Sequence, residues 1–201
     1  MAINTAIIEK LNKQTKLFNA DWVAVTKKQT IEVTQELYNN NLRNFGENKA
    51  QDFLDKYNKL PKDISWHFIG HLQTNKVKSI IDKVKCIHAV DSKKLLKTIQ
   101  KEAVKIQKTI DVFIQVHIAE EESKYGFSPE RAIDFFKDFE KTEYPNVNIL
   151  GLMAMATNTD NKEQIRSEFQ ELKNLKDKIS SSLNINLPKL SMGMSGDYEI
   201  A

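Results

Sequence analysis

The feature that most constrains the fold of this chain is a regular alternation between short apolar runs and longer segments of helical period. The short runs are rich in valine, isoleucine, phenylalanine and methionine. They lack the polar alternation of a half-exposed strand, which is typical of strands buried on both faces of a parallel sheet. Seven strands are predicted in this way, at 22–26, 44–46, 65–69, 86–90, 111–118, 148–155 and 189–194.

Helices are predicted before the first strand and between successive strands, because apolar residues recur there at helical spacing. Thr30 is a predicted cap for one of them, and Ser128 followed by Pro129 opens another. No linker rich in proline or glycine divides the chain, so residues 1–201 are expected to form one domain. Two architectures fit this order. The regular rhythm favours a TIM barrel, and the count of seven strands favours a doubly wound open sheet.

The charge balance argues against a nucleic-acid-binding protein. Lysine and arginine total 30 against 27 acidic residues, a formal net charge of +3, and only three of the basic residues are arginine. Recognition of phosphates and bases relies on arginine, and the chain has no long run of like charges. The sequence therefore predicts no nucleic-acid partner.

The cysteine content and the apolar stretches limit where the chain is expected to work. The single cysteine, Cys86, excludes an intrachain disulfide and a cysteine-based zinc site, and we expect it to be a small buried apolar residue. No apolar stretch reaches the roughly 18 residues that a membrane-spanning helix needs. The N-terminal segment lacks the basic start and uninterrupted apolar run of a signal peptide. A cytoplasmic protein without a membrane partner is expected.

Lys27 stands out among the residues at the carboxyl ends of the predicted strands, where both candidate architectures bind ligands. Side chains alternate along a strand, so Val23, Val25 and Lys27 are expected on one side, with Lys27 at the mouth of the sheet. Partial removal from water would lower the pKa of its amine, and a neutral amine condenses with aldehydes. The alternative is that Lys27, like its neighbour Lys28, only solvates the end of a strand.

A segment rich in glycine and serine, 190–197, is the second candidate. Free backbone amides and hydroxyl groups between a strand and a helix start are suited to binding a phosphate. The segment matches neither the P-loop nor the dinucleotide-binding pattern, so an ordinary tight turn is the competing interpretation.

The histidines carry a weaker signal. His67 and His71 do not share a helix face, so no metal site is expected, and His67 is interpreted as a hydrogen-bonded interior residue. The same interpretation applies to His88 and His117, and the acidic run 120–122 is interpreted as a solvated loop.

In combination these segments resemble the pyridoxal-phosphate homeostasis protein family, whose single domain is similar to the barrel of bacterial alanine racemase. The resemblance extends over essentially the whole chain from residue 22 onward. The stretches that carry it are VAVTK (23–27), NFGEN with Gln51 (44–51), WHFIGHLQTNKVK (66–78), IHAVDS (87–92), IQVHIAEEESKYGF (114–127), LGLMAM (150–155) and LSMGMSGDYEIA (190–201).

The resemblance implies a TIM barrel in which Lys27 carries pyridoxal 5′-phosphate as an internal aldimine, a Schiff base. It further implies a set of cofactor-binding positions around that lysine. Near the phosphate these are Ser191, Met192, Gly193 and Ser195, and near the ring they are Asn48, His67 and Met153.

The family is understood as a carrier or regulator of pyridoxal phosphate that serves cofactor-dependent apo-enzymes, rather than as a catalyst. The alternative is an amino-acid racemase-like enzyme, which needs a second acid–base group, and the related racemases supply that group from a second domain. Members of the family continue with an eighth strand, and this chain stops at Ala201. We therefore expect a barrel without its eighth strand, a monomer in the family pattern that associates if its edges stay open.

Overall fold

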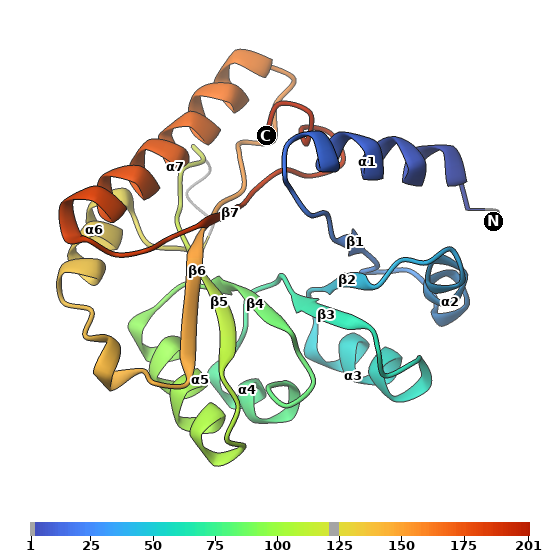
Figure 1. The fold of residues 1–201 in the computed structure, drawn as a ribbon, viewed down its shortest axis with the longest axis horizontal. Helices are drawn as coiled ribbons and strands as arrows, with labels where there is room; N and C mark the ends of the chain where they lie inside the picture. The colour runs from blue at the N-terminus through green and yellow to red at the C-terminus, as the bar shows by residue number, and fades with distance from the viewer. Residues whose placement is uncertain (1–2, 121–124) are drawn as a thin grey trace.

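The computed structural model describes residues 3–120 and 125–201, so part of the acidic run 120–122 lies outside the described residues. Seven strands form a single sheet, as the sequence predicts (Figure 1). All of them run parallel to their neighbours. Their bounds are Ala24–Val25 (β1), Asn44–Glu47 (β2), Ser65–Phe68 (β3), Cys86–Val90 (β4), Ile110–Gln115 (β5), Val147–Met153 (β6) and Lys189–Ser191 (β7).

One helix precedes the first strand and one follows each of the first six strands. They are Thr5–Leu17 (α1), Ile31–Asn39 (α2), Ala50–Lys59 (α3), Thr74–Ile80 (α4), Lys93–Lys105 (α5), Pro129–Lys137 (α6) and Lys162–Leu183 (α7), with a short 3-10 turn at Lys141–Glu143 (η1). The predicted caps are present, because the Thr30 and Ser128 side chains accept hydrogen bonds from the amides of Val33 and Arg131.

The strand order decides between the two architectures that the sequence leaves open. Each strand pairs with the next one along the chain, in the order β1 to β7. A doubly wound sheet reverses its strand order partway, whereas a barrel keeps sequential order and carries its helices on one face. Figure 1 shows a curved sheet with helices around its outside and with β1 and β7 as its two edges. The fold is a curled half-barrel of the TIM type.

The main core lies between the sheet and the helices. Trp66 of β3 packs on Phe45 of β2 and on Phe53 of α3, with ring centroids 5.9 Å and 5.6 Å apart, respectively. All three side chains are almost fully buried. Burying a side chain of this size contributes about 1.5–3 kcal/mol, so this cluster fixes α3 against the sheet.

The opposite, concave face is closed at its centre and open at its edges. Strand pairing places Val25, Gly46, His67 and Cys86 in one row across β1 to β4. Cys86 is buried, whereas Val25 is 47% exposed. Burial on both faces therefore holds for β4 and fails for β1, because no described segment covers the concave side of this edge strand.

Helix α1 is amphipathic as predicted, but none of its residues is buried. Ile7 and Leu17 are exposed, and so is Phe18 just beyond the helix. Ile8, which is half-buried, packs against the main core, and Lys10 forms an exposed ion pair with Glu199 at 2.7 Å. None of the described helices is long and apolar enough to cross a bilayer.

Candidate functional site

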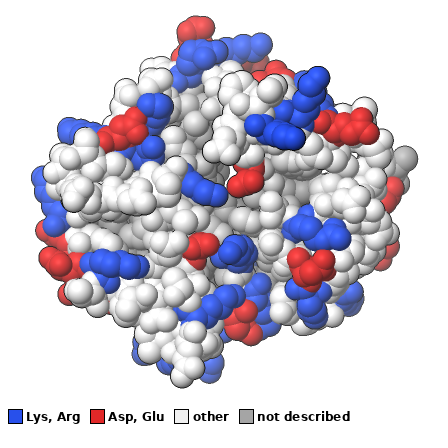
Figure 2. Space-filling view, viewed as in Figure 1, with Lys and Arg blue, Asp and Glu red and all other residues white. Residues whose placement is uncertain are grey.

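The candidate site is the mouth of the half-barrel, where the carboxyl ends of the parallel strands come together. Figure 2 shows the face of Figure 1 in space-filling form, hollowed near its middle, with basic and acidic side chains around the hollow. Ligands of such folds bind at this end because the strand ends and the loops after them converge there. The predicted residues after β1, β2 and β7 can therefore be assessed together.

Lys27 lies two residues beyond the end of β1, and hydrogen bonds hold the backbone of the intervening Thr26. The Thr26 amide donates to the Gly46 carbonyl at 3.0 Å, and the Thr26 carbonyl accepts from Lys56 Nζ at 2.6 Å. The Lys27 residue itself is exposed. The predicted shelter from water is therefore absent among the described residues, because β1 is an edge strand with an open concave side.

A buried ion pair, which sequence reasoning missed, anchors this strand end from the helix side. Lys56 Nζ of α3 lies 2.6 Å from Glu47 Oε1 of β2, and both side chains are almost completely buried. Thr26 Oγ1 donates to the same carboxylate oxygen at 2.7 Å. The other oxygen, Glu47 Oε2, has no hydrogen-bond partner among the described residues. The sequence signal that could have indicated this pair is the position of Lys56 on the apolar face of a predicted helix that follows the strand with Glu47.

Asn48 lies at the end of β2 against a glycine that the fold requires. A Cβ atom added to Gly70 would lie 2.3 Å from the Asn48 carbonyl oxygen and 2.7 Å from the Asn48 Cβ. No side chain fits at position 70 without a backbone shift, so the loop after β3 packs directly on Asn48. The Asn48 side chain is half-buried, and its amide makes no hydrogen bond among the described residues.

Two histidines and a serine form a hydrogen-bonded chain across the concave interior. His67 Nδ1 lies 2.8 Å from His88 Nε2, and His88 Nδ1 lies 2.7 Å from Ser191 Oγ. These two hydrogen bonds join β3 and β4 to β7, the strand at one edge of the sheet. Burial lowers the pKa of His67 to about 4 and that of His88 to about 3, so both rings are neutral near pH 7. The interpretation of His67 as a hydrogen-bonded interior residue is confirmed.

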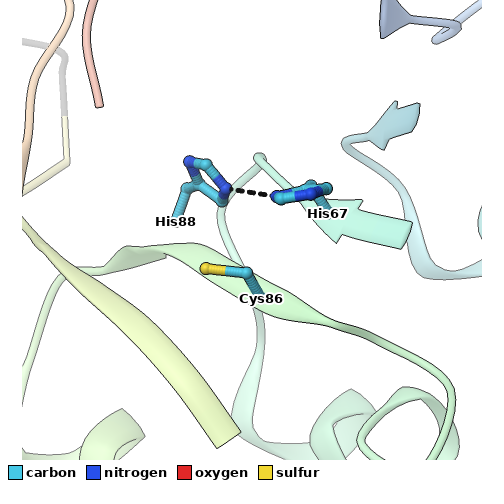
Figure 3. Close-up of side chains that lie close together, drawn as sticks. All are labelled: His67, Cys86 and His88. Carbon is cyan, nitrogen blue, oxygen red and sulfur yellow. Dashed lines mark hydrogen bonds between the residues drawn. The ribbon is translucent and has the colours of Figure 1, made fainter. Parts of the chain in front are cut away.

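Cys86 and Met153 lie in the same interior layer. Cys86 packs with Phe113 and Met153 in a small apolar cluster, and all three are buried. Burial raises the pKa of the Cys86 thiol well above its usual range. Figure 3 shows the thiol beside the two imidazoles, with His67 on β3 and both Cys86 and His88 on β4. Burial of Cys86 agrees with the sequence prediction.

The glycine-rich segment forms a succession of tight turns after β7. Gly193 has φ +90°, which favours glycine, and the Met194 amide donates to the Asp197 carboxylate. The amides of Ser195 and Gly196 have no partner among the described residues. The Met192 side chain is half-buried and packs against Ile165 and Phe169 of α7.

The structure thus brings some of the predicted site residues together and leaves others apart. Ser191 and His67 are joined through His88, and Met153 shares the Cys86 cluster. Within the part of the chain that the structure describes, Lys27 makes no hydrogen bond or ion pair with any of them. His71 belongs elsewhere: its Nδ1 lies 2.7 Å from Asp91 Oδ2.

The mixed cluster of His67, Cys86 and His88 is a feature that the sequence argument against a zinc site missed. The single cysteine, and histidines that share no helix face, predicted no such site. The available signal was spacing, because Cys86 and His88 are two residues apart in one strand and therefore face the same side. The pairing of Cys86 with His67, which completes the cluster, follows only from strand register.

Comparison with known proteins adds independent findings. The sequence model of the family described as "Alanine racemase, N-terminal domain" matches residues 5–201. The chain is 46% identical over 171 residues to the pyridoxal phosphate homeostasis protein of Aquifex aeolicus, covering 85% of this chain and 74% of that protein. It is 35% identical over 202 residues to the protein of the same name from Helicobacter pylori strain 26695, covering 98% and 88%.

Solved structures with similar folds include a relative of this kind and an alanine racemase. PipY of Synechococcus elongatus PCC7942, solved with PLP bound, superposes with a TM-score of 0.79 at 26% identity, covering 89% of this chain and 84% of that one. Alanine racemase of Clostridium difficile 630 superposes with a TM-score of 0.70 at 14% identity and covers 92% of this chain and 49% of its own. The second likeness concerns the fold alone.

Proposed function

The chain belongs to the pyridoxal phosphate homeostasis protein family, and on that premise we propose that it binds pyridoxal 5′-phosphate (PLP) and acts in the homeostasis of this cofactor. The observation that carries the proposal is the likeness, over 89% of this chain, to PipY solved with PLP bound. Relatives at 46% and 35% identity that bear the homeostasis name support the cellular role. The proposal treats residues 1–201 as one binding domain.

The chemistry of the mouth fits the two ends of this cofactor. PLP, when bound, supplies an aldehyde that reacts with a primary amine and a phosphate that needs hydrogen-bond donors. Lys27 offers an amine at the end of β1, and the buried pair of Lys56 and Glu47 holds the preceding Thr26 in place. We propose Lys27 as the residue that joins the cofactor covalently.

The turn after β7 supplies donors for a phosphate. The unpartnered amides of Ser195 and Gly196 support this role, as does the Gly193 backbone with its positive φ. The Ser191 hydroxyl is already within hydrogen-bond distance of His88 Nδ1, so His88 would orient it. Met192 contributes its backbone, and its side chain packs against α7.

Residues of the interior layer and of the rim would hold the ring. Met153 supplies an apolar surface there, and neutral His67 supplies a polar ring nitrogen. Asn48 offers a free amide at the rim, held in place by its close contact with Gly70. These three roles complete the proposed binding set.

The exposure of Lys27 supports a carrier over a sealed catalytic site. An exposed amine at an open edge strand leaves bound cofactor accessible to an incoming amine or to an apo-enzyme that needs PLP. We therefore propose PLP-dependent apo-enzymes as recipients and the cytoplasm as the place of action. The likeness to alanine racemase concerns the fold alone and supports no racemase activity.

Borohydride reduction tests the proposal directly. Purified protein is incubated with PLP, reduced, digested and analysed by mass spectrometry, and the pyridoxyl group is expected on Lys27. Lys27→Ala should lose the label. The matched control is Lys28→Asn, because Lys28 has φ +64° and asparagine tolerates that conformation; it should retain the label. Labelling spread over surface lysines, or unchanged in Lys27→Ala, would refute the assignment.

The carrier role has a separate readout. Loaded protein, freed of excess cofactor, is mixed with an apo-enzyme that requires PLP, and the recovery of that enzyme's activity is followed. Wild type should restore activity and Lys27→Ala, treated in the same way, should not. Equal recovery with both proteins would contradict delivery from Lys27.

A further inference from the structure

The interior of the half-barrel contains a cluster of three metal-binding side chains, and the proposed function gives a cofactor contact to only one of them, His67. One ligand atom from each of His67, Cys86 and His88 lies within 4.8 Å of the other two. Cys86 and His88 are buried and His67 is half-buried. They come from adjacent strands, with His67 paired in register with Cys86, so the pairing of β3 with β4 holds the backbone that carries them.

We propose that His67, Cys86 and His88 bind one Zn²⁺ ion in the concave interior of the half-barrel. Imidazole nitrogen and thiolate sulfur are the ligands that zinc prefers, and three protein ligands leave the fourth tetrahedral position for water. Bond lengths of about 2.0 Å to nitrogen and 2.3 Å to sulfur imply ligand separations of about 3.3–3.5 Å. The imidazole nitrogens of His67 and His88, now 2.8 Å apart, need to separate by about half an ångström.

The surroundings of His88 match those of a zinc-bound histidine. Such a ligand commonly donates its second N–H to a neighbouring acceptor, which fixes the tautomer and aims the free nitrogen at the metal. His88 Nδ1 lies 2.7 Å from Ser191 Oγ, so its Nε2 is the nitrogen left for the ion. The proton shared between His67 and His88 would move to the outer nitrogen of its own ring when the ion enters.

The proton balance of binding follows from the states of the three ligands. Near pH 7 an imidazole of ordinary pKa is mostly neutral and a cysteine thiol of ordinary pKa is protonated. Zinc binding breaks the S–H bond of Cys86, forms a Zn–S bond and releases one proton to solvent. The site gains one net positive charge. Carboxylates are absent from the ligand set, which disfavours Ca²⁺ and Mg²⁺.

Metal titration of the full chain tests the proposal without PLP present, so its outcome is independent of Lys27. Protein stripped with a chelator is titrated with zinc chloride against a chromophoric competitor, and bound zinc is measured by atomic emission. One zinc per chain and one proton released per zinc are expected. Substitution with Co²⁺ should produce a thiolate-to-cobalt charge-transfer band, a readout that needs no variant.

Variants assign the ligands. Cys86→Ala should weaken zinc binding by more than about 100-fold and abolish the cobalt band, and Ser191→Ala should weaken binding by about tenfold. His71→Ala is the matched control, because His71 pairs with Asp91 outside the cluster, and it should bind as wild type. Circular dichroism verifies that each variant is folded. Absence of zinc uptake, a missing thiolate band in wild type, or equal affinity in folded Cys86→Ala overturns the proposal.

Discussion

Removal of the Lys56 side chain is the sharpest test of how the fold positions Lys27. Lys56 Nζ makes two contacts of 2.6 Å, one with Glu47 Oε1 and one with the Thr26 carbonyl. In Lys56→Met the Glu47 carboxylate would remain fully buried with the Thr26 hydroxyl as its hydrogen-bond donor. Breaking a buried ion pair from one side costs about 3–5 kcal/mol, because the remaining charge stays unsolvated.

Thermal and urea unfolding measure this cost. For a chain of this size each kcal/mol moves the melting temperature by about 2–4 °C, so Lys56→Met should melt roughly 6–20 °C lower than wild type. The control is Lys59→Met, an exposed lysine of the same helix, whose effect should stay within about 0.5 kcal/mol. The borohydride labelling of Lys27 should fall in parallel, because Thr26 loses its anchor.

A double variant distinguishes the loss of the ion pair from the cost of leaving one buried charge without its partner. Lys56→Met combined with Glu47→Leu removes both charges and fills the space with apolar groups, and such replacements are often neutral or stabilising. The double variant should therefore be more stable than Lys56→Met alone. A cost below about 1 kcal/mol for Lys56→Met, or a double variant as unstable as the sum of the two single variants, would refute the reasoning.

Three further predictions follow from the interior and the mouth. Gly70→Ala should lose about 1–3 kcal/mol of stability in urea unfolding, because its Cβ would lie 2.3 Å from a backbone oxygen, whereas Gly196→Ala meets nothing within 4 Å and should have little effect. In the unfolded chain His67 and His88 gain a proton below their ordinary pKa of 6.5, whereas burial lowers their pKa values in the folded chain to about 4 and 3. The stability that depends on neutral rings is therefore fully present above pH 6.5 and falls as the pH is lowered. Unfolding at pH 7, 6 and 5 should show up to about 1.4 kcal/mol lost per pH unit for each histidine, and a flat profile would contradict their burial. Cys86, 2% exposed, should react with a thiol reagent only on unfolding, and rapid labelling of native metal-free protein would count against the packed interior.

Local sequence signals predicted most of the elements. The predicted strand 86–90 has the observed bounds of β4, and the capping roles of Thr30 and Ser128 are confirmed. These features depend on residues near one another in the chain, so pattern and propensity suffice. The predicted strand 22–26 shortened to Ala24–Val25, because an edge strand pairs on one side only.

The candidate site divides in the same way. The carboxyl-end positions of Lys27, Asn48 and the glycine-rich turn were readable, because strand ends of a parallel sheet converge. The exposure of Lys27 could not be predicted from the sequence, because it depends on whether any segment covers the concave side of β1. The buried pair of Lys56 and Glu47 also escaped, because it joins residues of a helix and a strand through the core.

By itself the sequence determined the count and order of strands and helices, the family and the residue types at the mouth. The strand pattern left two architectures open, the family resemblance implied a barrel, and the structure shows a curled sheet of sequential strands. The tertiary structure alone decided that His67 meets His88 and Cys86 across two strands. It also decided that Ser191 reaches His88 from β7. The physical reason is that periodicity encodes which face a side chain takes. Contacts between distant segments depend instead on strand order, register and curvature, which no local pattern specifies.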